Sequence, residues 1–253
     1  MRFGLETAIE SIMTATRQAL AEAGLGEDAL GTAYAGIGLA GTGQRGARDL
    51  LESWPHPFAG AWFEGDGYMA YLGAFGGDDG GIVIAGTGSI GITYQDHTIR
   101  IGGYGFPVSD EGSGADIGLN ALRDAMRTLD GRAEPGPLSR DVLAQFSNDP
   151  AAVIEWMESA TATDYAALAP LVVRHAQDGD PAGRRLMVQA ASHISELVDA
   201  LLRRGVPQVA LIGGLANILS GYMPPEVRDR LVAPQADAMA GAILLAKMKL
   251  GLA

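Results

Sequence analysis

The 253-residue chain carries 18 basic and 30 acidic side chains and has a formal net charge of −12, which argues against nucleic acid or an anionic membrane as partner. It has no cysteine, so disulfides, thiolate catalysis and sulfur-ligated zinc or iron–sulfur clusters are excluded. An apolar share of 47% predicts a soluble globular protein of one or two domains, and the sequence shows no secretory or membrane-spanning pattern. We therefore expect a cytoplasmic location.

The first 80 residues show helices and strands in alternation. A helical period of apolar residues runs over 5–23 and ends at Gly24. The patterns that follow predict a strand over 34–39, a helix over 45–54, a strand over 61–64 and a helix over 68–75. The glycine-rich stretch 76–81 is the best candidate for a linker between domains.

Beyond the linker the pattern resumes with a hairpin-like segment over 82–101. A helix is expected from about 113 to 129, a loop over 131–137, and mostly helical structure as far as Arg204. The last elements are a strand over 208–212, a short helix over 224–231 and a final helix over 236–249. This alternation predicts an α/β protein with two domains, 1–78 and 79–253, and a cleft between them.

Glycine-rich turns follow several of the expected strands. The pattern G-x-G-x-x-G, typical of dinucleotide sites, fits three segments: Gly36 to Gly41, Gly41 to Gly46 and Gly86 to Gly91. With 36 glycines in the chain, chance matches are expected. The last segment continues as a strand, whereas a dinucleotide fingerprint must open a helix. Gly41 to Gly46 has the better context and keeps an NAD enzyme open as an alternative.

The turn Gly86-Thr87-Gly88-Ser89 lies between two expected strands. It could be a plain hairpin, but Thr87 and Ser89 add hydroxyl donors where glycines bare the backbone N–H groups, so we favour contact with phosphate. Gly213-Gly214 follows another apolar strand. It is either a strand-to-helix turn or a place where main chain approaches the adenosine of a nucleotide, and the residues leave both open.

Acidic residues lie beside these glycines. Asp66, between two glycines at a strand end, is either a helix cap or the base that accepts a proton from a substrate hydroxyl. Asp110 and Glu111 could also be helix-start residues. Their glycine neighbours, with Gly103 and Tyr104 just upstream, favour a loop that approaches a polyhydroxylated ligand closely.

In this order the segments resemble the N-acetylglucosamine and glucosamine kinases, of the BadF/BadG/BcrA/BcrD-type ATPases in the actin-like (ribonuclease H-like) ATPase superfamily. The resemblance covers almost the whole chain, and its matching pieces are Gly38-Leu39-Ala40-Gly41, Asp66-Gly67, Gly86-Thr87-Gly88-Ser89, Gly102-Gly103-Tyr104-Gly105, Asp110-Glu111-Gly112-Ser113, Gly213-Gly214, and Asp237 with Gly241-Ala242.

The resemblance implies an actin-like pair of domains that closes over ATP, Mg²⁺ and an amino sugar, and it is compatible with a homodimer. Asp66 would be the catalytic base toward the C6 hydroxyl of the sugar. The implied phosphate and nucleotide contacts are Gly86, Thr87, Gly88, Ser89, Gly213 and Gly214. The implied sugar contacts are Thr87, Gly88, Gly103, Tyr104, Asp110 and Glu111, and no residue is assigned as a metal ligand.

Two departures from the family pattern stand out. Tyr104 takes a place where relatives commonly have tryptophan, and both side chains can flank a sugar ring. Residues 1–60 supply no β-hairpin with an Asp-x-Gly-Gly-Thr phosphate loop, and the first strands of the N-terminal domain are missing from the pattern. We therefore expect this polypeptide to bind ATP weakly and turn over poorly.

Other functions remain to be distinguished. An activator of radical dehydratases is nearly excluded, because those proteins hold an iron–sulfur cluster through cysteines. A non-catalytic sugar or nucleotide sensor is the main alternative to a kinase. The sequence leaves open whether glucosamine or its N-acetyl form is the acceptor.

Overall fold

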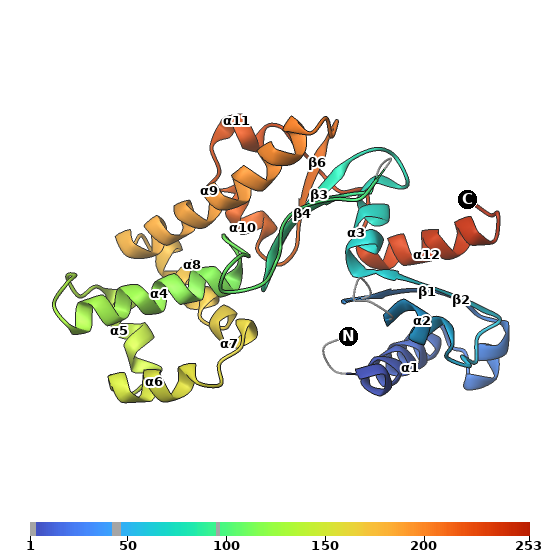
Figure 1. Ribbon diagram of the computed structural model, residues 1–253, viewed down its shortest axis with the longest axis horizontal. Helices are drawn as coiled ribbons and strands as arrows, with labels where there is room; N and C mark the ends of the chain where they lie inside the picture. The colour runs from blue at the N-terminus through green and yellow to red at the C-terminus, as the bar shows by residue number, and fades with distance from the viewer. Residues whose placement is uncertain (1–3, 42–46, 95–96) are drawn as a thin grey trace. The chain divides into compact units, whose positions relative to one another are not determined.

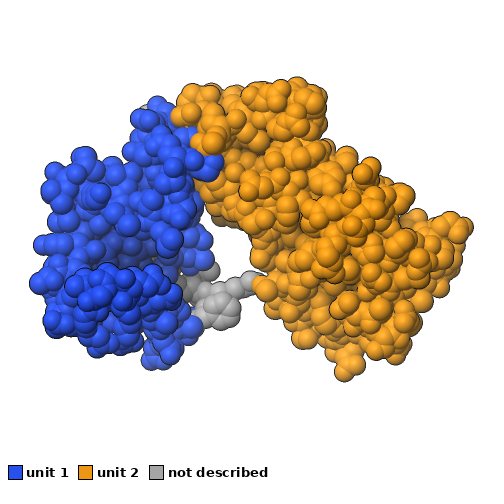
Figure 2. Space-filling view, turned by 180° about the vertical axis from the view of Figure 1, so that it is seen from behind, with its two compact units in different colours: residues 1–79, 234–253 blue, residues 80–233 orange. Residues whose placement is uncertain are grey.

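The computed structural model describes residues 4–41, 47–94 and 97–253. Its internal contacts divide the chain into two compact units, coloured separately in Figure 2. Unit 1 comprises residues 1–79 and 234–253, and unit 2 comprises residues 80–233. The break at residue 79 lies inside the predicted linker. The last twenty residues belong with unit 1, whereas the predicted domain 79–253 included them.

Unit 1 contains a two-stranded parallel sheet with helices around it. Strands β1 (Tyr34–Leu39) and β2 (Gly60–Gly65) run in register, with Leu39 beside Gly65, so both end at the same edge. The helical elements of this unit are α1 (Gly4–Glu22), η1 (Glu27–Thr32), α2 (Ala47–Glu52), α3 (Asp66–Phe75) and α12 (Ala238–Lys249). The predicted helices and strands of this unit are confirmed where they are described, and residues 45–46 of the helix predicted over 45–54 lie outside the described residues. One core cluster of the unit comprises Ile12, Ile37, Leu51, Phe58 and Phe63.

Helix α12 explains why the end of the chain belongs to unit 1, since it packs against α3 and β1. Glycines allow the backbones to touch. A Cβ on Gly36 would overlap the carbonyl of Ala242, and one on Gly241 would overlap that of Met69. Two glycines of the Gly36–Gly41 pattern therefore serve close packing, Gly36 against α12 and Gly38 against the Met69 side chain.

Unit 2 contains a five-stranded mixed sheet in the order β5-β4-β3-β6-β7. The predicted hairpin segment forms β3 (Gly81–Ala85), β4 (Ser89–Thr93) and β5 (Ile99–Gly102), which are antiparallel neighbours. Strand β6 (Val209–Ile212) runs parallel to β3, with Ile84 beside Ile212. The segments after β3 and β6 therefore leave the sheet at the same edge, where α/β proteins commonly bind ligands.

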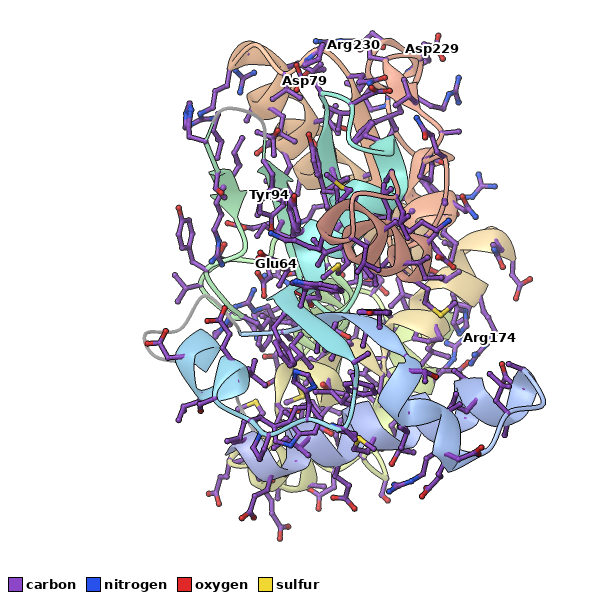
Figure 3. The ribbon with its side chains drawn as sticks, turned by 90° about the vertical axis from the view of Figure 1, so that its right-hand side faces the viewer. Glu64, Asp79, Tyr94, Arg174, Asp229 and Arg230 are labelled. Atoms are coloured by element: carbon purple, nitrogen blue, oxygen red, sulfur yellow. The ribbon has the colours of Figure 1, made fainter. Side chains whose placement is uncertain are left out.

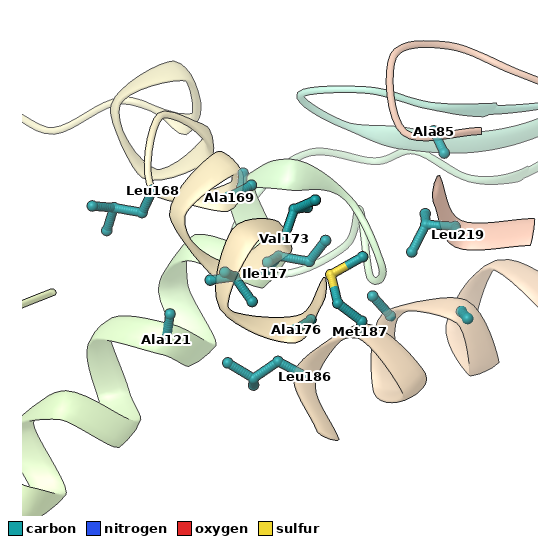
Figure 4. Packing of buried hydrophobic residues seen from close by; sticks show 14 of the residues in the cluster. Ala85, Ile117, Ala121, Leu168, Ala169, Val173, Ala176, Leu186, Met187 and Leu219 are labelled. Carbon is teal, nitrogen blue, oxygen red and sulfur yellow. The ribbon is translucent and has the colours of Figure 1, made fainter. Parts of the chain in front are cut away.

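The helices of unit 2 pack on one another to build a large core. They are α4 (Gly114–Leu129), α5 (Pro137–Ala144), α6 (Pro150–Met157), α7 (Ala162–Ala166), α8 (Ala169–Gln177), α9 (Pro181–Arg203), α10 (Ala216–Ser220) and α11 (Pro225–Arg228). Helices α9 and α10 contact the sheet, and α9 crosses one of its faces (Figure 1). Figure 4 shows the packing of Ile117, Val173, Met187 and Leu219 in this core.

One predicted element differs from the structure. The short helix expected over 224–231 ends at Arg228, and Leu231–Val232 form β7 beside β6. The pairing of Leu231 with Val209 satisfies backbone groups that a longer helix would have used internally. In the part of the chain that the structure describes, no helix is both long and apolar enough to cross a bilayer.

Candidate nucleotide and sugar site

A cavity of about 480 Å³ opens in unit 2 at the edge where β3 and β6 end. Two glycine segments that are distant in sequence meet in its wall, the turn after β3 and the turn after β6. The start of α4 and one face of α7 and α8 complete it. Its lining residues are Gly86, Thr87, Gly114, Ala166, Ala169, Pro170, Val173, Arg174, Gly214, Leu215 and Ile218.

The turn after β3 is held by the first residues of α4. The amides of Gly114 and Ala115 donate to the carbonyls of Gly86 and Thr87, at 2.8 and 3.2 Å. These helix-start amides are therefore occupied by the turn itself rather than available to an anion. Thr87 is exposed, and within the described residues no acceptor takes up the amide of Thr87 or Gly88. The turn thus presents two amides and one hydroxyl as donors.

Ser89 has a structural role, and its contact with phosphate stays a prediction. Its side chain is buried and donates to the carbonyl of Glu111 at 2.7 Å. The hydroxyl of Ser89 therefore ties the start of β4 to the acidic loop and is not left as a donor for a ligand.

Asp110 organises the loop in which it lies. Its backbone is left-handed, with φ of 70°. Burial raises the pKa of Asp110 above the ordinary aspartate value, although the backbone amides of Gly105, Ser89 and Phe106 and the charge of Arg100 act in the opposite direction. The carboxylate also lies beside the turn after β3, since a Cβ on Gly88 would be 3.0 Å from it.

Glu111 and Tyr104 are among the exposed side chains of this loop. Glu111 makes no side-chain hydrogen bond to any described residue. Tyr104 is 75% exposed, with the Arg100 guanidinium 4.9 Å from its ring centre. Gly103 differs in role: its φ is 67°, and a Cβ there would lie 2.8 Å from Ile90, so it permits a sharp turn against β4.

The two glycines after β6 have separate roles. Gly213 has φ of 102°, and a Cβ there would overlap the backbone of Ala85 at the end of β3. The amide of Leu215 donates to the carbonyl of the same Ala85 at 3.0 Å. Gly214 has open space where its side chain would be, and it lines the cavity. Gly213 therefore allows the end of β6 to pack against the end of β3, and Gly214 leaves room for a ligand.

Asp66 lies in unit 1, where β2 passes into α3. The N-cap position of α3 is Gly65, so Asp66 is the first helical residue and does not cap the helix. It is exposed and accepts a hydrogen bond only from the amide of its neighbour Gly67, at 2.9 Å, among the described residues. Its carboxylate therefore lies at the edge where β1 and β2 end, which is suited to a ligand-facing group.

The NAD alternative receives no support from the described residues. Residues 42–46 of the Gly41–Gly46 pattern lie outside them. The Gly86–Gly91 pattern continues into β4, as expected for a turn that opens no helix.

Sequence reasoning missed the contribution of α7 and α8 to the cavity. Ala169 and Val173 of α8 line the cavity, but in the sequence these apolar residues look the same as the buried core residues of that helix. Arg174, labelled in Figure 3, is the charged group on this wall, and it is exposed. The only sequence signal for Arg174 is that a charged residue follows an apolar stretch. This pattern is too common to predict a binding residue.

Comparison with known proteins decides the family. The model of the BadF/BadG/BcrA/BcrD ATPase family matches residues 1–246. The chain belongs to this family. Its members are ATPases by name, so the chain is a member of a family of ATP-using proteins.

The relatives share most of the chain. The glucosamine kinase GspK of Vibrio cholerae is 35% identical, over 96% of this chain and 83% of its own length. The crystal structure of a predicted N-acetylglucosamine kinase from Chromobacterium violaceum has a TM-score of 0.88 and 38% identity, over 96% of this chain and 86% of that one. A related structure from Porphyromonas gingivalis, at 21% identity and a TM-score of 0.66, shares the fold, with 94% and 85% covered. The predicted α/β fold of actin-like ATPases is confirmed.

Proposed function

We propose that this chain is an amino-sugar kinase, which transfers the γ-phosphate of ATP to the C6 hydroxyl of N-acetylglucosamine or glucosamine. The 35% identity to a glucosamine kinase over 96% of the chain supports this function. So does membership of the ATPase family across residues 1–246. A cytoplasmic location and a homodimer are parts of the same proposal.

One observation carries the proposal: the turns after β3 and β6 share the wall of a single cavity in unit 2. Thr87 presents hydroxyl and amide donors at one side, and Gly214 offers open main chain at another. Donors suit the phosphates of a nucleotide, while the apolar wall of Ala169 and Val173 suits its base. The cavity volume of about 480 Å³ lies within the range of small-ligand sites.

Phosphoryl transfer depends on alignment and charge stabilisation more than on covalent chemistry by the protein. Thr87 and Gly88 would hold the phosphates of ATP in line with the acceptor. Glu111 and Tyr104 would orient the sugar, the first by accepting hydroxyl protons and the second by flanking the ring. Asp66 would accept the proton of the C6 hydroxyl as the bond to phosphorus forms.

Mg²⁺ would arrive with the phosphates of ATP. The described residues include no group of three or more His, Asp or Glu side chains that could hold a metal. This fits Mg²⁺, which keeps several waters and needs only one or two carboxylates beside substrate phosphates. When bound, the ion neutralises charge that develops on the transferred group.

A direct assay tests the proposal. The purified chain is incubated with ATP, Mg²⁺ and either sugar, and ADP and sugar 6-phosphate are measured together. Equal formation of both products supports the kinase. Binding of ADP and sugar without product formation supports the sensor, and retention of NADH in place of ADP supports the NAD enzyme.

A further inference from the structure

A second cavity in unit 2 is separate from the candidate nucleotide cavity and shares no lining residue with it. Its volume is about 900 Å³. It lies between α4, α6, the beginning of α9 and the loop after α4. Its lining residues are Leu119, Asn120, Leu122, Arg123, Asp124, Met126, Arg127, Arg132, Ala133, Val153, Met157, Arg185, Leu186 and Gln189.

The charge of this cavity is opposite to that of the whole chain. Four arginines line it, against a single carboxylate, Asp124, while the chain has a formal net charge of −12. Arg123 and Arg127 are one helical turn apart on α4, so both extend from the same face. Among residues 4–41, 47–94 and 97–253, no carboxylate oxygen lies within 4.0 Å of a guanidinium nitrogen of Arg123 or Arg127. The cavity therefore favours an anion.

Three of the arginines are oriented by neighbours. Arg185 pairs with Asp124 across α9 and α4. Arg132 pairs with Asp130 at 2.6 Å, and Arg123 donates to the amide oxygen of Asn120 at 3.3 Å. A guanidinium has five N–H donors in a planar fork, so these anchors fix its direction and leave donors unused. Oriented donors bind a ligand with a smaller loss of side-chain entropy.

Helix-end electrostatics explain only part of this arrangement. Arg127 is in the last turn of α4, where a cation stabilises the helix. Arg123 lies in the middle of α4, and Arg185 is near the start of α9, so the helix dipole attracts neither. Most of the other lining residues are apolar, Leu119, Val153 and Met157 among them, and Asn120 and Gln189 are polar.

We propose that this cavity binds a small phosphorylated organic molecule, with its phosphate on the arginines and its organic part against the apolar wall. Guanidinium forks match phosphate oxygens in geometry and charge. The proposal goes beyond the kinase activity, because it concerns a separate site and does not depend on catalysis.

Calorimetry with phenyl phosphate as the probe tests this site. The protein is first saturated with ADP, and benzyl alcohol serves as the uncharged control ligand. We expect phenyl phosphate to bind with a dissociation constant of about 1 mM or tighter, and benzyl alcohol not to bind measurably. The double variant Arg123→Gln/Arg127→Gln should weaken phenyl phosphate binding by ~10-fold or more, since it removes two charged donors but keeps helix-forming side chains.

The matched control is Arg203→Gln/Arg204→Gln, which removes the same number of charges. These two arginines lie at the end of α9, whereas the beginning of α9 lines the cavity. It should bind phenyl phosphate as the unmodified chain does. Absence of phenyl phosphate binding, or equal binding by both double variants, would overturn the proposal. If ADP fails to bind while the arginine dependence persists, the kinase proposal is weakened and the anion site stands.

Discussion

At the scale of single residues, the chemistry of the proposed kinase concentrates on a few exposed side chains. Asp66, Thr87, Tyr104 and Glu111 are exposed, whereas Ser89 and the glycines hold the backbone around them. The division is physical, because a group whose hydrogen bonds are used inside the protein cannot also bind a ligand strongly.

The role of Asp66 as general base predicts a large effect on turnover. Asp66→Asn should lower kcat by ~10²–10⁴-fold, because an amide cannot accept the hydroxyl proton. ADP affinity should stay unchanged, as the candidate nucleotide cavity lies in unit 2. Steady-state kinetics with calorimetry measure both. A normal kcat in this variant would remove Asp66 from the mechanism.

Arg174 should contribute to nucleotide binding through its planar cation at the apolar wall. Arg174→Ala should raise the KM for ATP by roughly 3- to 30-fold and leave the KM for sugar unchanged. Arg140→Ala, an exposed arginine on α5, is the control. If Arg174→Lys restores the KM for ATP, the contact is a simple charge pair with phosphate and not stacking on the base.

The raised pKa of Asp110 predicts a pH dependence of stability. The folded carboxyl holds its proton more tightly than the unfolded one, so its contribution to stability is present at low pH. That contribution is lost as the pH rises from the ordinary aspartate value through the raised folded value. Urea unfolding should therefore show that Asp110→Asn loses less stability, relative to the unmodified chain, at pH 7 than in acid. A difference that does not change with pH would contradict this.

At the scale of elements, the site depends on where β3, β6 and α4 end or begin. Parallel pairing of β3 with β6 brings two turns to one edge, and the first amides of α4 bind the carbonyls of the turn after β3. Gly213 is needed because the turn after β6 crosses close to Ala85.

Adjacent glycines give a matched test of this arrangement. Gly213→Ala should destabilise the protein by about 1–3 kcal/mol, because its φ of 102° is strained for alanine and its Cβ would overlap Ala85. Gly214→Ala should change the free energy of unfolding by less than about 0.5 kcal/mol but weaken ADP binding. Denaturant unfolding and calorimetry distinguish the two. Equal destabilisation by both substitutions would argue against the separate roles.

At the scale of the whole molecule, the chain leaves unit 1, forms unit 2 and returns to unit 1 with α12. The return depends on glycines that allow α12, α3 and β1 to touch through their backbones. Unit 2 keeps its own sheet and core.

Disrupting the packing of α12 in unit 1 should abolish phosphoryl transfer but leave ADP binding intact. In Gly241→Val the side chain would overlap the backbone of Met69 and Gly73, so we expect α12 to detach and unit 1 to become sensitive to protease. ADP binding should persist while phosphoryl transfer is lost. Limited proteolysis with mass spectrometry identifies the cleaved unit. Ala238→Val, at an exposed position one turn earlier on α12, provides the control, and equal protease sensitivity in both variants would contradict the proposed role of Gly241.

The sequence by itself determined the α/β class, most helices and strands, and the two glycine segments that follow β3 and β6. These are local properties, because periodicity, turn residues and short motifs depend on neighbours along the chain. Tertiary structure alone decided the return of α12 to unit 1, the burial of Ser89, the unequal roles of Gly213 and Gly214, and the part played by Arg174 and the arginine-lined cavity. Each of these depends on backbones or side chains that are far apart in sequence and meet only when the chain packs.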